Sequence, residues 1–214
     1  MSELKRVLVL GATGAVGQAL LNQLEKQPQI QEIAVITRRP LSQSEKTSKV
    51  REYLMNYGEL DADSECFRCD ALFCALGTTR KKAGSDENFI KIDHDYSLEA
   101  AKIARKRSVP HFLIVSAHGA DSESHFFYNR LKGMIERDLI ALKFPKLTIV
   151  RPSLLIRNTG DWRPVEKIAQ VLALYLPKKW RSVSTEAVAI SLVRSYQKIF
   201  DGLHIIRNQD IFLD

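Results

Sequence analysis

Residues 7–17 run Val7-Leu8-Val9-Leu10-Gly11-Ala12-Thr13-Gly14-Ala15-Val16-Gly17, an apolar run followed by a glycine at every third position. The apolar run predicts a buried strand, and Val16, Leu20 and Leu24 have the i, i+4, i+8 spacing of a helix. A glycine-rich turn between a strand and a helix cradles a nucleotide diphosphate at the positive end of the helix dipole. An ordinary strand-to-helix turn is the alternative, but the flanking residues favour nucleotide binding.

The three glycines of this turn have different predicted tasks. Gly11 lets the chain turn tightly, Gly14 lets a diphosphate approach the backbone N–H groups, and Gly17 allows the helix to pack closely on the strand. We expect the nucleotide to be bound by residues of the turn and of the first helical turn, namely Gly11, Thr13, Gly14, Ala15, Val16 and Gly17.

Apolar, β-branched runs alternate with segments of helical period along most of the chain. Strands are predicted near 6–10, 32–37, 50–55, 70–75, 111–116, 146–151 and 203–207. Helices are predicted near 15–26, 87–107, 123–143, 164–175 and 185–200. The alternation predicts an α/β fold, a Rossmann-type doubly wound parallel sheet, in a single domain of residues 1–214. Segment 157–181 interrupts the rhythm and is predicted to be a small C-terminal substrate lid, whereas segment 40–69 shows little pattern.

The composition is that of an ordinary globular protein, with a formal charge of +7 and a pI of about 9.3. Its cations are scattered along the chain, so we expect no nucleic-acid partner. No apolar run is long enough to span a bilayer, and residues 1–6 leave no room for a signal peptide before the first strand. These observations predict a cytoplasmic protein with no membrane partner.

Three cysteines, Cys66, Cys69 and Cys74, lie close together, and the first two have the spacing of a zinc or redox motif. A structural zinc site usually needs four ligands, and no second pair of cysteines is present. Cys74 falls in an apolar strand, where a thiol is usually a small buried hydrophobic group. We therefore expect reduced thiols and no metal.

The second predicted strand ends at Thr37-Arg38-Arg39, where a site for NAD would place Asp or Glu against the ribose 2′-hydroxyl. Two guanidinium groups instead favour a 2′-phosphate. Arg38 and Arg39 therefore predict NADP(H) as the cofactor, with a solvated basic loop as the alternative. The fourth strand ends in Leu76, Gly77 and Thr78, which we expect to line the middle of the cofactor because Gly77 permits close backbone approach.

The helix that follows the fifth strand carries Tyr128 and Lys132 at i and i+4, hence on one face. An ammonium group lowers the pKa of a nearby phenol and can bind the nicotinamide ribose, while the phenol exchanges a proton with a carbonyl oxygen. Ser116, at the end of the fifth strand, would orient the substrate oxygen. Segment 175–179 also has the Tyr-x-x-x-Lys spacing, but Pro177 interrupts the helix that this alignment needs.

With these motifs the chain resembles the short-chain dehydrogenases/reductases, and among them the atypical group that contains the Tat-interacting-protein oxidoreductases of animals. The likeness covers nearly the whole chain and rests on segments 10–17, 37–39, 76–80, 91–96, 115–121, 128–133 and 151–152. It implies binding of NADPH, and it implies that Pro152, Ser153 and Leu154 approach the nicotinamide. The wider superfamily often has a proton-relay asparagine on its fourth helix, and Lys91 falls at that place here.

Together these features predict an NADPH-dependent oxidoreductase that acts on a small carbonyl substrate through Tyr128, Lys132 and Ser116. A redox-sensing regulator that binds NADP(H) without turnover is the alternative, and a nucleotide-sugar epimerase is a further one. Such an epimerase uses the same three residues but usually carries a larger substrate domain. His118 and His125 fall near the predicted site without a catalytic assignment, and we expect a monomer or a homodimer.

Overall fold

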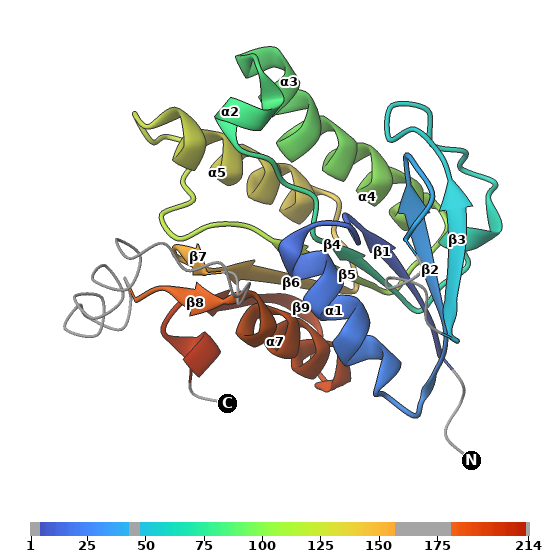
Figure 1. Ribbon diagram of the computed structural model, residues 1–214. Helices are drawn as coiled ribbons and strands as arrows, with labels where there is room; N and C mark the ends of the chain where they lie inside the picture. Colours follow the sequence, from blue (N-terminus) through green and yellow to red (C-terminus); the bar gives the residue numbers. More distant parts are fainter. Residues whose placement is uncertain (1–4, 43–47, 157–180, 213–214) are drawn as a thin grey trace.

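The computed structural model describes residues 5–42, 48–156 and 181–212 (Figure 1). Apart from Arg181, the segment predicted as a lid, 157–181, lies outside these residues. The predicted helix 164–175 and the second Tyr-x-x-x-Lys segment, 175–179, lie outside them as well.

The core of the described chain is a seven-stranded sheet in the order β3-β2-β1-β4-β5-β6-β9, in which every neighbouring pair is parallel. The strands are β1 (Lys5–Leu10), β2 (Ile30–Thr37), β3 (Val50–Leu54), β4 (Ala71–Cys74), β5 (His111–Val115), β6 (Lys146–Arg151) and β9 (Gly202–Arg207). β7 (Leu155–Ile156) and β8 (Val183–Ser184) form a separate parallel pair. The predicted Rossmann-type doubly wound sheet is confirmed, with its strands within a few residues of their predicted positions.

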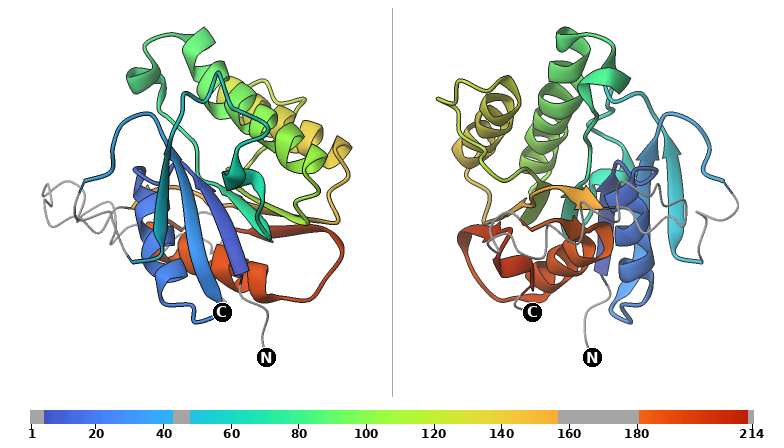
Figure 2. Two further views of the ribbon diagram at one scale, coloured as in Figure 1. Left: turned by 90° about the vertical axis from the view of Figure 1, so that its right-hand side faces the viewer. Right: turned by 60° about the vertical axis from the view of Figure 1, so that its left-hand side comes forward.

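Helices cover both faces of the sheet (Figures 1 and 2). α1 (Ala15–Glu25) and α7 (Thr185–Gln197) pack together on one face, and α4 (Tyr96–Lys106) and α5 (Phe127–Ala141) lie on the other. The short elements are η2 (Glu65–Phe67), α2 (Arg80–Ala83), α3 (Asp86–Ile90), η3 (Lys91–Asp95) and η5 (Asp210–Phe212). Because helices cover it on both sides, β1 is apolar throughout its buried length.

Two predicted helices differ in detail from the structure. The helix predicted near 87–107 is divided into α3, a π-helical turn at η3, and α4. The helix predicted near 123–143 begins only at Phe127, because Asp121 and Ser124 form a hydrogen-bonded turn before it. In segment 40–69 the chain forms β3 and then η2, and it places Tyr57 in the core beside β1.

The order of the strands brings the predicted site together. In a parallel sheet the carboxyl ends of all strands lie along one edge, and ligands bind where the strand order reverses. Here the reversal falls between β1 and β4, whose ends lead into the glycine turn and into residues 75–79. The ends of β2, β5 and β6 flank this point, so residues distant in sequence meet at one edge.

Candidate functional site

An open cleft of about 1590 Å³ runs along the carboxyl edge of the sheet. Its walls include the predicted site residues Gly11, Thr13, Gly14, Ala15, Val16, Arg38, Arg39, Leu76, Gly77, Thr78, Ser116, Tyr128, Lys132, Pro152 and Leu154. Gly17 is buried outside this lining, in keeping with a role in packing. The fold therefore brings the predicted nucleotide side and the predicted catalytic side to one cleft.

The glycine turn is shaped by close backbone contacts. Gly11 has φ +79°, and a Cβ atom there would lie 2.5 Å from the carbonyl oxygen of Ala75. A Cβ atom on Gly17 would lie 2.1 Å from the Gly11 oxygen, so α1 could not pack as it does. Gly14 is the N-cap of α1, without a side-chain cap and without an acidic residue in the first turn. The amino end of α1 therefore faces the cleft as an open anion site, which fits a diphosphate.

Tyr57 stabilises this turn through two hydrogen bonds. Its buried hydroxyl accepts a hydrogen bond from the Gly11 N–H at 3.2 Å and donates one to the carbonyl oxygen of Ile36 at 2.7 Å. Burial raises the pKa of the Tyr57 phenol to about 12, so it keeps its proton at physiological pH. One side chain thus links the glycine turn to β2, and sequence analysis did not identify it.

Arg38 and Arg39 follow β2 at the edge of the cleft, and both side chains are exposed. Within the residues that the structure describes, no carboxylate lies within ion-pair distance of either guanidinium group. Each can therefore bind an anion without first breaking an ion pair. The position at the end of β2 is where an adenosine ribose lies in this fold.

Lys132 is held by a buried ion pair. Its Nζ atom lies 2.8 Å from Asp93 Oδ1, and the two side chains are 5% and 1% exposed. Burial alone would lower the pKa of Lys132, but the Asp93 carboxylate outweighs this effect and raises that pKa above its usual value. The other Asp93 oxygen accepts a hydrogen bond from the Thr78 N–H at 2.8 Å. Asp93 therefore joins the charged lysine to the loop after β4.

Ser116 belongs to a second buried network. Its hydroxyl donates a hydrogen bond to Glu136 Oε1, and the Glu136 carboxylate also pairs with the guanidinium group of Arg151. Arg151 Nε lies 3.0 and 3.1 Å from the two carboxylate oxygens. An ionised carboxylate paired with a guanidinium group only accepts hydrogen bonds, so the hydrogen of the Ser116 hydroxyl points to Glu136. Ser116 also lines the cleft.

Tyr128 lies in the first turn of α5, one helical turn before Lys132, and is 44% exposed. Its side chain lines the cleft together with Ser116 and Lys132, so the structure brings the three predicted catalytic residues to one cleft. His118 also lines the cleft and is exposed, whereas His125 is exposed outside the cleft lining.

Asp93, Glu136 and Arg151 are site residues that sequence analysis missed. Asp93 lies within the segment 91–96 that carries the resemblance, but the superfamily pattern points to Lys91, at the position of the relay asparagine. The structure places Lys91 on the exposed rim, with its ammonium 5.9 Å from the Tyr96 ring centroid. The inward residue of this turn is Asp93. The sequence shows Asp93 only as an acidic residue close to Lys91. Its burial opposite Lys132 of α5 becomes visible in the folded chain.

The three cysteines are free thiols among the described residues. Burial raises the pKa of the Cys69 thiol to about 12, and Cys74 donates a hydrogen bond to Ser97. A thiol must lose its proton to bind a metal, which these surroundings oppose. In the described part of the chain no group of three or more histidine, cysteine or acidic residues could hold a metal ion. No described helix is both long and apolar enough to cross a membrane.

Comparison with known proteins is consistent with this geometry. Residues 6–88 match the family model described as semialdehyde dehydrogenase, NAD binding domain, which supports a nicotinamide cofactor in the cleft. A UDP-N-acetylglucosamine 4-epimerase from Methanobrevibacter ruminantium M1 superposes with a TM-score of 0.72, covering 96% of this chain and 77% of the epimerase. At 12% sequence identity that likeness shows the fold alone.

Relatives at higher identity come from animals and fungi. Protein HTATIP2 of Rattus norvegicus is 36% identical over 180 residues, which cover 83% of this chain and 74% of the relative. The mitochondrial protein fmp52 of Emericella nidulans is 35% identical over 179 residues, covering 80% of this chain and 76% of the relative.

The fungal relatives contradict the cytoplasmic location predicted above, because they are named mitochondrial proteins. That prediction was wrong in its reasoning as well, since lack of a secretory signal does not distinguish the cytosol from an organelle. The resemblance to the Tat-interacting-protein group, in contrast, is confirmed. The chain belongs to the family of Rossmann-fold proteins that contains HTATIP2 and the fungal FMP52 proteins.

Proposed function

We propose that this protein is an NADPH-dependent oxidoreductase that interconverts a small carbonyl compound and the corresponding alcohol. One observation carries the proposal. Tyr128, Lys132 and Ser116 line the same cleft as the open amino end of α1. A protein that only binds a nucleotide needs the glycine turn, but it has no need of a phenol and a charged lysine one helical turn apart beside the bound nucleotide.

The residues of the first half of the cleft fit a dinucleotide phosphate. Backbone N–H groups at Ala15 and Val16 would bind the diphosphate, because the amino end of α1 has no side-chain cap. Arg38 and Arg39 support NADP(H) over NAD(H), since a guanidinium group binds a 2′-phosphate in a bidentate, charge-assisted manner. When bound, the reduced nicotinamide supplies the hydride for the carbonyl carbon.

The protein's own side chains would handle the proton. In reduction, the Tyr128 phenol donates its proton to the substrate oxygen as that oxygen gains charge. The Lys132 ammonium group donates one N–H to Asp93, and its two other N–H groups would donate to the ribose hydroxyls and to the phenol oxygen. Ser116 lines the cleft beside them, and its O–H, which donates to Glu136 in this structure, would have to turn toward the substrate oxygen in order to orient it. The same residues run the reaction in reverse.

The test is Tyr128→Phe, which keeps the aromatic ring and removes the transferable proton. Consumption of NADPH would be followed by absorbance against a panel of aldehydes, ketones and quinones. We expect turnover by the parent protein and a loss of about 10²- to 10⁴-fold in kcat in the variant, with NADPH affinity unchanged. An active parent whose rate survives the substitution would remove Tyr128 from the mechanism. Tight NADPH binding without turnover across the panel would favour a redox-sensing regulator.

A further inference from the structure

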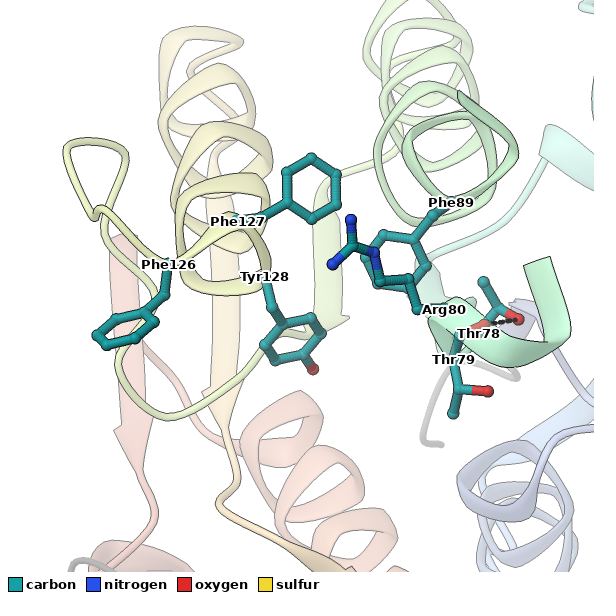
Figure 3. Close-up of a pocket in the computed structure, with 7 residues that line it drawn as sticks. All are labelled: Thr78, Thr79, Arg80, Phe89, Phe126, Phe127 and Tyr128. Atoms are coloured by element: carbon teal, nitrogen blue, oxygen red, sulfur yellow. Dashed lines mark hydrogen bonds between the residues drawn. The ribbon is translucent and has the colours of Figure 1, made fainter. Parts of the chain in front are cut away.

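A second pocket, of about 450 Å³, adjoins the cleft next to Tyr128 (Figure 3). Its lining comes from the loop after β4, from the start of α2, from α3 and from the start of α5. It consists of Thr78, Thr79, Arg80, Phe89, Phe126, Phe127 and Tyr128. Thr78, Thr79 and Tyr128 also line the cleft, so the two spaces share a wall. Whatever fills the pocket therefore lies against the residue proposed to transfer the proton.

Four of the seven lining residues are aromatic. Phe89 is buried, and its ring centroid lies 5.9 Å from that of Phe127 and 6.2 Å from that of Tyr128. Phe126, in contrast, is 76% exposed, although a large apolar side chain usually gains stability by burial. In Figure 3 the ring of Phe126 lies on the other side of Tyr128 from Phe89. The pocket thus presents aromatic surface that the protein's own side chains leave open.

Arg80 is the charged residue of the pocket, and its charge is already compensated. Its guanidinium group pairs with Asp86 through two hydrogen bonds, Nε to Oδ1 at 2.6 Å and Nη2 to Oδ2 at 2.5 Å. The same group lies 5.2 Å from the Phe127 ring centroid, over the face of the ring. A paired guanidinium group adds a flat, weakly hydrated surface rather than a free anion site. The pocket therefore suits a neutral, flat group better than a carboxylate or phosphate.

We propose that this pocket is a substrate subsite for a neutral aromatic or quinoid ring that carries the reacting carbonyl or hydroxyl group. The ring would lie among Phe89, Phe126 and Phe127, and its oxygen would meet the Tyr128 hydroxyl at the shared wall. The volume falls within the range of small-molecule sites, about 300–1,000 Å³. The orientation of the ring, with its oxygen toward Tyr128, rests on the proposed function. Binding of the ring can be measured separately, without turnover.

The first experiment measures binding without chemistry. The full chain would be titrated with 2-naphthol, a neutral fluorescent alcohol, in the absence of cofactor. We expect saturable binding, and we expect Phe126→Ala to weaken it about 3–10-fold by removing one aromatic wall. Because Phe126 is largely exposed, the variant should fold normally, which circular dichroism would verify. Ile199→Ala removes another exposed apolar side chain, 99% exposed and outside both cavities, and should leave binding unchanged.

The second experiment measures turnover with two aldehydes that differ in their ring. Phe126→Ala should raise KM for 2-naphthaldehyde and leave KM for cyclohexanecarbaldehyde nearly unchanged, because only the flat ring uses the aromatic wall. Failure to bind 2-naphthol, or equal binding by the parent and Phe126→Ala, would overturn the subsite. Binding that depends on Phe126 without turnover of either aldehyde would support the subsite and count against the proposed oxidoreductase activity.

Discussion

The two halves of the cleft are stabilised by different interactions. Around β1 and β2 the site is formed by backbone, with Gly11 and Gly17 packed so tightly that a Cβ atom would clash. Around α5 and β6 it is formed by buried charges, with Lys132 held by Asp93 and with Glu136 held by Arg151. The glycines of the first half lie close together in the sequence, although Gly11 also packs against Ala75. The second depends on pairs that only the folded chain brings together.

This difference has consequences for how each half responds to mutation. A site formed by backbone is lost when a substitution adds a side chain that fills it. A site formed by buried charges is lost when a substitution removes one member of an ion pair. Removing one member of a buried ion pair costs far more than the pair contributes, because the other charge remains buried without a partner. The proposed substrate side should therefore be the more sensitive half to conservative substitutions.

The largest effect is expected for Asp93→Asn, which removes one charge and keeps the size of the side chain. Lys132 would remain buried as an unpaired ammonium group, at a cost of about 3–5 kcal/mol in the free energy of unfolding. Urea unfolding would measure this loss. The control is Asp93→Asn combined with Lys132→Met, which should recover most of the stability but no activity. A single variant as stable as the parent would show that the ion pair does not organise this half.

The same pair gives a pH dependence with a definite sign. The pKa of Lys132 is raised in the folded protein, so its contribution to stability is fully present below the unfolded value of about 10.4. That contribution is lost as pH rises above this value and through the folded pKa. Above about pH 10.4 the free energy of unfolding of the parent should therefore fall more steeply with pH than that of the double variant. At neutral pH the two free energies should change with pH in the same way.

On the other half of the cleft, Arg38→Ala should affect the cofactor and leave the fold intact, because the side chain is exposed. Loss of one charge-assisted phosphate contact typically costs about 1.5–3 kcal/mol, so NADPH affinity should fall about tenfold or more. NADH lacks the 2′-phosphate and serves as the internal control, with affinity expected to change little. Fluorescence titration would measure both, and equal binding of NADPH and NADH by the parent would contradict the NADP(H) assignment.

The contrast between the halves also explains what the sequence could predict. The strands, the glycine turn and the basic end of β2 follow from local patterns, and Tyr128 and Lys132 follow from the period of a helix. Asp93 does not, because the π-helical turn around it shifts the register of side chains relative to a regular α-helix. Glu136 likewise looks like a surface residue of α5 until the end of β6 brings Arg151 to it.

Tyr57 shows the same limit within the backbone half. It comes from a segment that sequence analysis left without a clear structure, yet its hydroxyl bonds both the glycine turn and β2. No local pattern predicts that contact, since Gly11 and Tyr57 are 46 residues apart in the chain. The glycine turn was therefore predictable in position and shape, but not in what supports it.

The smallest effect is expected for Tyr57→Phe, which removes only this hydroxyl. A typical intramolecular hydrogen bond contributes about 0.5–1.5 kcal/mol, so the free energy of unfolding should fall by about 1 kcal/mol. NADPH affinity should fall less than tenfold, because the contacts of Gly11 and Gly17 still shape the turn. Tyr53→Phe is the matched control, since the buried Tyr53 hydroxyl has no hydrogen-bond partner among the described residues. Its removal should leave stability unchanged or raise it slightly, because a buried polar group without a partner is unfavourable. Equal effects of the two substitutions in urea unfolding and NADPH titration would show that the turn supports itself.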